Sequence, residues 1–230
     1  MNMVTSPYKR ELGKRVLIMT AVQAEMEVVL SGLHRDRGSD KGIDVLVAGI
    51  GPVAAAVSTL KALLTAEYNL VVNAGIGGGF SGRAEVGSLV VANKIVAADL
   101  GVETFEGFSN LDELSLGTTS IQVDNGLVQG VTEALLAAGL PVKTGPVLTV
   151  STVTGTAESA AKLAARVPGA AAEAMEGYGV AVAAREQGLP IIELRAISNL
   201  VGPRDRAAWR IKDALGVLEK ASLVLSEVLL

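Results

Sequence analysis

Short runs rich in β-branched residues alternate with alanine-rich stretches of helical length over most of this 230-residue chain. The runs expected to be strands are Arg15–Thr20, Ile43–Ala48, Leu70–Asn73, Ser88–Ala92, Val142–Val150 and Ile191–Ser198. The stretches expected to be helices are Glu25–Leu33, Val53–Ala66, Gly126–Ala138, Ala157–Arg166, Gly177–Gln187 and Ala207–Leu229. This alternation predicts an α/β fold with a largely parallel sheet between layers of helices. Ligands of such sheets bind beyond the carboxyl ends of the strands.

The length and the hydrophobic content predict a single domain. Half of the residues are hydrophobic, enough for one sizeable core in a chain of this length. Residues 1–14 hold three basic side chains and no apolar region, so we expect a flexible N-terminus, not a secretory signal, before one domain at 15–230. No apolar run approaches the ~18 residues of a membrane-spanning helix, which predicts a cytoplasmic protein without a membrane partner. The polar segment from about Leu100 to Asp124 is expected to be a long active-site loop.

The composition excludes several kinds of chemistry. A net charge of −4 with intermixed signs is not the footprint of a nucleic-acid-binding protein. The absence of cysteine removes thiolate nucleophiles and zinc–thiolate sites, and one histidine does not build a histidine-rich metal centre. We therefore expect neither metal nor cofactor, and chemistry performed by carboxylates, amides and backbone groups.

Two glycine clusters follow expected strands. The first, at Gly49 and Gly51, matches a dinucleotide-binding pattern, but the acidic residue that should end the next strand is missing, because that strand is expected to end at Asn73. The alternative is a tight strand-to-helix turn with Pro52 at the first helical position. The second cluster, Gly75–Gly79, is interpreted as a turn where a ligand approaches the backbone closely.

Six motifs, in a fixed order from Val16 onward, carry a resemblance to a known family. They are VLIMTAVQAEMEVVL, VAGIGPVAAA, VVNAGIGGGF, VGSLVVA, AMEGYGVA and LRAISNLVG. Together they resemble the purine nucleosidase/phosphorylase family, whose best-known hydrolases act on methylthioadenosine and S-adenosylhomocysteine. The resemblance implies a three-layer α/β fold with a central mixed, partly barrel-like sheet flanked by helices. It also implies a small purine nucleoside and water as partners, and a homodimer or higher homo-oligomer.

The resemblance also assigns roles to residues. It implies that Glu25 activates the attacking water and that Glu176 binds the two sugar hydroxyls, with Arg195 organising that carboxylate. The alternative for Glu25 is a carboxylate in the first helical turn that the helix dipole stabilises. For Glu176 the alternative is a buried ion pair with Arg195, which is compatible with binding of the sugar. Met175 is expected beneath the sugar, although a core methionine is the alternative. The further substrate-binding residues expected are Gly77, Gly78, Val153 and Ser198.

Asn199 is the most informative departure from the family pattern, because adenine-specific relatives carry an aspartic acid there. Alternation along the last strand predicts that Glu193, Arg195, Ile197 and Asn199 share one face, where Glu193 and Arg195 can neutralise one another. An amide donates hydrogen bonds to nitrogen-7 or to a 6-oxo group but has no acid proton to transfer. Asn199 therefore favours a 6-oxopurine over adenine.

The segment ISNLVGPRD, running on to Trp209, resembles the futalosine hydrolase branch of the family, which releases hypoxanthine from futalosine during menaquinone biosynthesis. Asp205 is expected to cap a helix start. Trp209 is either a lid or a helix anchor. Arg204 and Arg206 either face the benzoate of the substrate or are solvated surface charges.

Hydrolysis of futalosine is thus the leading functional hypothesis, and three rivals remain. A phosphorolytic inosine or guanosine enzyme needs cations around phosphate, whereas the first loop here reads AVQAEM. A methylthioadenosine hydrolase would have to tolerate Asn199. A non-catalytic nucleoside-binding module would have no evident need for both Glu25 and Glu176.

Overall fold

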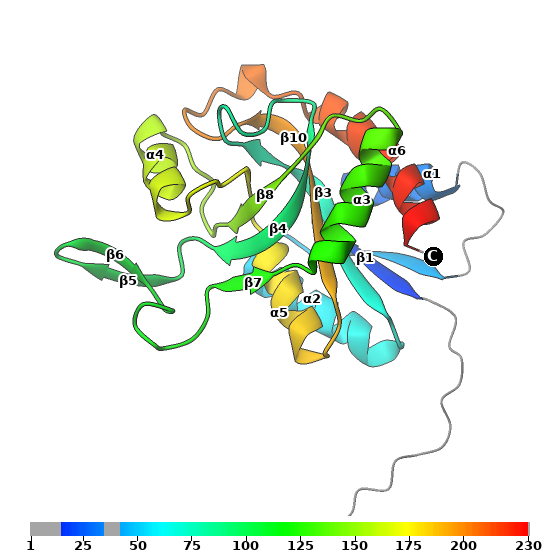
Figure 1. The fold of residues 1–230 in the computed structure, drawn as a ribbon, viewed down its shortest axis with the longest axis horizontal. Coiled ribbons are helices and arrows are strands. Elements are labelled where there is room, and N and C mark those ends of the chain that lie inside the picture. The colour runs from blue at the N-terminus through cyan, green and yellow to red at the C-terminus, as the bar shows by residue number, and fades with distance from the viewer. Residues whose placement is uncertain (1–14, 35–41, 230) are drawn as a thin grey trace, which may run out of the picture.

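The computed structural model describes residues 15–34 and 42–229 (Figure 1). The N-terminus expected to be flexible, residues 1–14, lies outside the described residues. Within these described residues the main sheet contains eight strands, namely β1 (Val16–Thr20), β2 (Ile43–Val47), β3 (Leu70–Gly79), β4 (Leu89–Ala97), β7 (Ser120–Gln122), β8 (Val142–Thr149), β9 (Ala172–Ala174) and β10 (Ile191–Leu200). Five pairings are parallel, and β4–β10, β4–β7 and β3–β9 are antiparallel, so the sheet is mixed.

Part of the sheet closes on itself. Its order is β10-β4-β8-β9-β3-β1-β2, and β10 also pairs with β3, so five strands form a closed ring. The two outer strands, β1 and β2, continue from this ring as an open parallel extension. The expected mixed, partly barrel-like sheet is therefore confirmed.

The α-helices of the described residues are α1 (Gln23–His34), α2 (Pro52–Thr65), α3 (Asn125–Ala137), α4 (Ala157–Arg166), α5 (Gly177–Glu186) and α6 (Ile211–Val228). Five of these described helices cover the sheet in two groups, α1 with α3 and α6, and α2 with α5, whereas α4 lies apart from both (Figure 1). The helices α1 and α6 pack on one another, as do α2 and α5. All five residues of β1 are buried between the layers, which explains its continuous apolar sequence. None of the helices in the described part of the chain is long and apolar enough to cross a membrane.

Two expected boundaries were wrong in a way that matters for the site. Strand β3 does not end at Asn73 but continues through the whole glycine cluster to Gly79. These glycines are strand residues because β9 and β10 pair with both sides of them. The last helix begins at Ile211, and the residues before it form a separate 3-10 helix, η1 (Arg206–Ala208).

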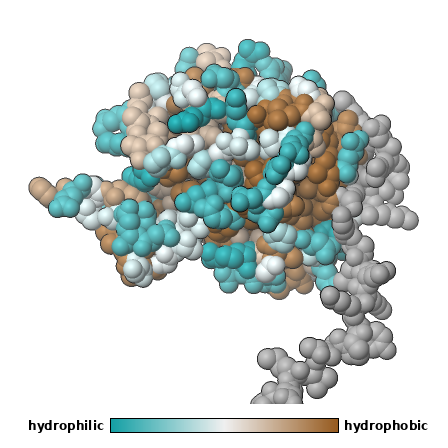
Figure 2. All heavy atoms as spheres, in the orientation of Figure 1, coloured by the Kyte–Doolittle hydropathy of each residue, from teal (hydrophilic) through white to brown (hydrophobic). Residues whose placement is uncertain are grey.

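The segment from Leu100 to Asp124 was also predicted incorrectly as one long loop. It contains a hairpin of β5 (Gly101–Thr104) and β6 (Gly107–Asn110), followed by β7, which pairs with β4. Figures 1 and 2 show the hairpin extending away from the rest of the molecule, with hydrophilic and hydrophobic residues mixed on its surface. Phe105 at its turn is fully exposed, whereas the ring of Phe108 packs under the guanidinium of Arg166.

Candidate active site

A cavity of about 320 Å³ lies beyond the carboxyl ends of β1, β3 and β10, where ligands of such sheets bind. Eight of the nine expected site residues line it: Glu25, Gly77, Gly78, Val153, Met175, Glu176, Ser198 and Asn199. The ninth, Arg195, is fully buried; it contacts Glu176 from behind the cavity wall, and its charge acts on Glu25. The remaining lining residues are Ala21, Val22, Ile50, Ile76, Thr154, Glu173, Ala174, Val201 and Trp209. The structure therefore brings the expected site together, and no lining residue comes from the segment 100–124.

Glu25 is held in the first turn of α1 by backbone amides. Its Oε2 accepts hydrogen bonds from Ala21 N at 2.8 Å and from Val22 N at 3.3 Å. Its Oε1 accepts one from Ile76 N at 2.8 Å, which links the helix to β3. Burial raises the pKa of Glu25 above its ordinary value, and these amides with the Arg195 charge only partly oppose the rise. A carboxylate with a raised pKa is a better base near neutral pH.

Gly75 makes room for this arrangement. A Cβ at Gly75 would lie 2.7 Å from both Glu25 Oε1 and Arg195 Nη1, closer than real side-chain contacts allow. The glycine therefore lets the carboxylate and the guanidinium approach the strand from one side. The sequence signal was present in the glycine run, although a turn was the wrong interpretation of it.

Glu176 stands at the N-terminus of α5, with 4% of its surface exposed. Gly51 N donates to its Oε1 at 3.3 Å, and Met175 N donates to its Oε2 at the same distance. Arg195 Nη1 lies 3.5 Å from Oε2, so the expected ion pair is present. Gly51 has a φ of +90° and is followed by Pro52 at the start of α2, so the tight-turn interpretation of the first glycine motif is confirmed.

Arg195 is the only cation in contact with the buried carboxylates of the described site. Its Nε donates to Glu193 Oε1 at 2.9 Å, and its Nη2 lies 2.5 Å from the Asn73 side-chain amide, whose oxygen faces the guanidinium in the orientation that satisfies its hydrogen bonds. Although burial by itself lowers the pKa of Arg195, the charges of Glu193, Glu176 and Glu25 raise it above its ordinary value. Asn73 was missed as a site residue because the strand was expected to end there.

A β-bulge in β10 sets the positions of Ser198 and Asn199. In the pairing with β3, Ile197 is opposite Gly77 and Asn199 is opposite Gly78, so Ser198 is skipped. Both Ser198 and Asn199 consequently line the cavity. The prediction that Asn199 shares a face with Ile197 was wrong, because the extra residue reverses the alternation.

Two neighbours fix the orientation of the Asn199 amide. Its Oδ1 accepts a hydrogen bond from the Ser198 hydroxyl at 2.8 Å, and its Nδ2 donates to Leu200 O at 3.0 Å. A carbonyl oxygen accepts hydrogen bonds only, so the Leu200 carbonyl holds the NH₂ group on its side. One N–H of the amide remains for a ligand.

Glu173 is a buried carboxylate of the cavity that no sequence motif marks. Thr154 N donates to its Oε1 at 2.9 Å, and the Thr154 hydroxyl donates to its Oε2. Burial raises the pKa of Glu173, and both Thr154 hydrogen bonds oppose the rise. The pair connects β9 to the segment that supplies Val153 to the cavity wall.

The segment after β10 completes the rim. Asp205 accepts a hydrogen bond from Ala207 N and caps η1, as expected. Trp209 ends η1 and lines the cavity, and the Arg204 guanidinium lies 5.5 Å from the centre of its ring. Arg204 and Arg206 are exposed and do not line the cavity.

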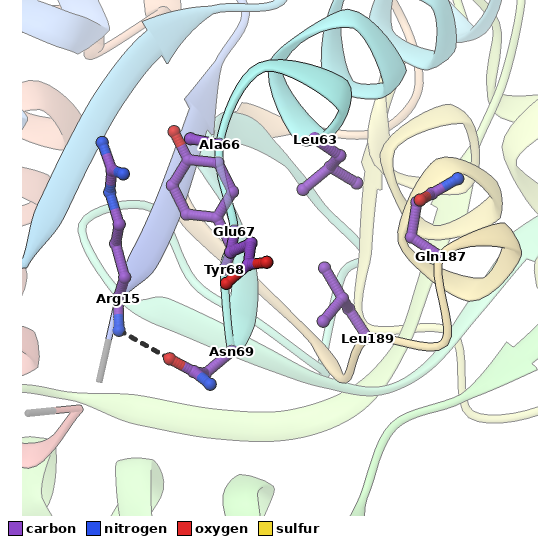
Figure 3. A pocket seen from close by; sticks show the side chains of 8 residues that line it. All are labelled: Arg15, Leu63, Ala66, Glu67, Tyr68, Asn69, Gln187 and Leu189. Carbon is purple, nitrogen blue, oxygen red and sulfur yellow. Dashed lines mark hydrogen bonds between the residues drawn. The ribbon is translucent and has the colours of Figure 1, made fainter. Parts of the chain in front are cut away.

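A second cavity, of about 500 Å³, lies at the other end of the sheet (Figure 3). Its lining includes Arg15, Asn69 and Leu189, which precede the first residues of β1, β3 and β10, and Arg15 N donates to Asn69 Oδ1 at 2.8 Å. Ligands of parallel strands bind at the opposite ends, so this cavity is not the candidate site. The described residues contain no cluster of three or more His, Cys, Asp or Glu residues that could hold a metal ion.

Comparison with known proteins identifies the family of this chain. The family model described as "Phosphorylase superfamily" matches residues 7–230. The chain belongs to this superfamily. Its closed five-stranded ring with flanking helices agrees with the superfamily's solved structures. One example is a methylthioadenosine/S-adenosylhomocysteine nucleosidase from Neisseria meningitidis bound to methylthio-immucillin-A, with a TM-score of 0.81 at 19% identity over 93% of this chain and 99% of the other.

Within the superfamily, the chain is similar to curated futalosine hydrolases. It is 50% identical to the enzyme of Streptomyces coelicolor, over 93% of this chain and 96% of the relative. It is 47% identical to the enzyme of Acidothermus cellulolyticus, over 89% of this chain and 87% of the relative. The family resemblance stated from the motifs is confirmed.

Proposed function

We propose that the chain hydrolyses the N-glycosidic bond of futalosine and releases hypoxanthine. The observation that carries the proposal is 50% identity to a futalosine hydrolase over almost the full length of both chains. The cavity supports it, because it combines two buried carboxylates with an oriented amide at the carboxyl ends of the strands. The substrate partners are accordingly a purine nucleoside and water.

Cleavage of a glycosidic bond passes through an oxocarbenium-like state, in which positive charge develops on the sugar. In our proposal Glu176 accepts hydrogen bonds from the sugar hydroxyls, and Met175 packs beneath the ring. Glu25 orients water toward the anomeric carbon and accepts its proton. The amides of Ala21, Val22 and Ile76 hold the Glu25 carboxylate in place for this step.

Asn199 is proposed to bind the leaving base, which takes the electron pair of the broken C–N bond, departs as an anion and then receives a proton from water. The free N–H of Asn199 donates to nitrogen-7 or to the 6-oxo group of hypoxanthine, both of which are acceptors. Gly78 lies beside the amide, and a Cβ there would come within 3.3 Å of Asn199 Nδ2. The missing side chain leaves space for a flat base next to the donor.

Hydrolysis is favoured over phosphorolysis by the charges of the cavity. Among the described residues, its lining includes three glutamates and no lysine or arginine. Arg195 stands behind the lining and is paired with Glu193 and Glu176. A phosphate ion would therefore meet like charges without a free cation to balance it.

The test is to incubate the purified protein with futalosine, inosine and methylthioadenosine, each with and without phosphate. We expect hypoxanthine from futalosine at the same rate in both buffers, and slower cleavage of the other two nucleosides. Chromatography of the released bases measures this. A strict requirement for phosphate would make the chain a phosphorylase, and faster release of adenine from methylthioadenosine would overturn the substrate assignment.

We also propose that the chain forms a homo-oligomer through α2. This helix carries Val53, Val57, Leu60 and Leu64 at helical spacing, with 77%, 49%, 37% and 70% of their surfaces exposed. The stripe continues to Ile50, which lines the cavity, so a second copy bound there would lie beside the site. Burial of such a stripe in an interface removes apolar surface from water.

Light scattering tests this proposal. We expect at least twice the chain mass of 23.5 kDa for the unaltered protein, and a shift toward the monomer for Leu64→Asp. Leu136→Asp on α3 is the matched control, because Leu136 is 54% exposed and lies outside the stripe. A monomeric unaltered protein, or equal effects of both substitutions, would argue against α2 as the interface. The cytoplasmic location expected from the sequence stays a prediction.

A further inference from the structure

Glu193 is a buried carboxylate that the proposed reaction does not use. It lies in β10, two residues before Arg195, and none of its surface is exposed. Its Oε1 accepts the hydrogen bond from Arg195 Nε, and its Oε2 has no hydrogen-bond partner among the described residues. Burial raises the pKa of Glu193, and the charge and hydrogen bond of Arg195 oppose the rise, so its ionised form depends on this one partner.

The buried cluster around Arg195 contains more negative than positive groups. One guanidinium faces the carboxylates of Glu193, Glu176 and Glu25. The charged groups that act on Glu25 are Arg195 from β10 and Glu176 from the start of α5. Those that act on Glu193 are the same two residues. The negative charge of Glu193 therefore offsets part of the Arg195 charge that acts on Glu25 and Glu176.

The geometry gives Glu193 the strongest contact of the three. Its 2.9 Å hydrogen bond to Nε is shorter than the 3.5 Å contact between Nη1 and Glu176. A Cβ at Gly177 would lie 2.3 Å from both oxygens of Glu193, so only glycine at the start of α5 admits the carboxylate here. Glu193 and the Asn73 oxygen together hold the guanidinium from two sides, which directs Nη1 toward the cavity.

We propose that Glu193 is a positioning residue that neutralises most of the Arg195 charge, so that Glu25 remains a base able to take a proton from water. Without Glu193, the full positive charge of Arg195 would act on Glu25 and stabilise its ionised form. Glu25 would then lose its proton more readily and accept one from water less readily. This inference rests on the proposed function, because it assumes that Glu25 is the base of the hydrolysis.

The substitution Glu193→Gln tests the proposal with little change of shape. The amide oxygen can keep the hydrogen bond from Arg195 Nε, and the NH₂ group takes the place of the unpartnered Oε2. The change therefore removes a charge and retains the single hydrogen bond. We expect the acidic limb of the pH profile of kcat/KM for futalosine to move to lower pH by about one unit. We also expect the plateau rate to fall by up to about tenfold, because a weaker base takes the proton.

Two further variants separate charge from structure. Glu193→Asp keeps the charge, so its acidic limb should stay where it is in the unaltered protein even if the rate falls. Glu193→Ser is neutral and places no side-chain atoms as large as a carboxylate beside Gly177. It should shift the acidic limb of the pH profile in the same direction as Glu193→Gln. Circular dichroism melting shows which variants keep the fold.

The outcomes distinguish this inference from the function on which it rests. If the unaltered protein does not cleave futalosine, the proposed function fails before any variant is compared. If the unaltered protein does cleave futalosine, the acidic limb of the neutral variants decides. The inference is wrong if these variants lower the rate but leave the limb in place, or if they move the limb to higher pH. It is also wrong if neither neutral variant folds, because Glu193 would then serve the structure alone.

Discussion

Replacing Glu25 with glutamine is expected to lower kcat for futalosine by about 10³-fold, which is within the usual contribution of a general base. An amide does not accept the proton that water must lose as it attacks the sugar. The NH₂ group of the glutamine would also face a backbone N–H donor, because both oxygens of Glu25 accept hydrogen bonds from backbone amides. The measurement is steady-state hydrolysis, with binding of hypoxanthine followed by calorimetry.

Binding of the base should survive this substitution, because Asn199 and the glycine strand are unchanged. Glu27→Gln is the matched control, since Glu27 is an exposed glutamate on the same helix. It should retain the rate of the unaltered protein. A Glu25→Gln protein that keeps more than about a tenth of the rate would show that another group activates the water.

The second large effect is expected for Asn199→Asp. The preference for futalosine over methylthioadenosine, as a ratio of kcat/KM values, should fall by about 10³-fold or more. An aspartate oxygen repels the 6-oxo group of hypoxanthine but accepts from the 6-amino group of adenine. The Leu200 carbonyl would face the second carboxyl oxygen instead of the NH₂ group, and this repulsion favours the protonated acid that an adenine leaving group needs.

Competition between the two nucleosides measures this ratio directly. Ser198→Ala is the control, because it removes only the hydroxyl that donates to Asn199 Oδ1. It should weaken both substrates by a similar, modest factor and leave the ratio nearly unchanged. If Asn199→Asp lowers the activity toward both substrates equally, the amide does not select the base.

The fold was predictable because the residues of most strands and helices favour the local structure that they adopt. Helix α4 matches its expected bounds, and α1, α2, α3 and α5 match within about two residues. The closure of the sheet was not visible in any pattern of residues, since it depends on β10 pairing with β3 and β4 at once. That feature came from the family resemblance. The three-residue β9 was missed because so short a strand leaves no periodic signal.

The site was predicted better than the local structure around it. Glu25, Glu176 and Asn199 were recognised from motifs, and they line one cavity. Glu173 was not given a role, because its importance lies in burial and in Thr154, a partner from a distant segment. Glu193 was considered only as a charge beside Arg195, since the sequence does not show how deeply the pair is buried. The bulge at Ser198 was missed for a related reason, since no glycine or proline marks it in the strand sequence.

The reaction itself can be tested with isotopically labelled water. The unaltered protein is incubated with futalosine in H₂¹⁸O without phosphate, and the products are identified by mass spectrometry. We expect unlabelled hypoxanthine and a sugar product carrying one ¹⁸O at the anomeric carbon. The Glu25→Gln variant should form both products much more slowly than the unaltered protein. Hypoxanthine formed without ¹⁸O in the sugar, or no release until phosphate is added, would contradict it.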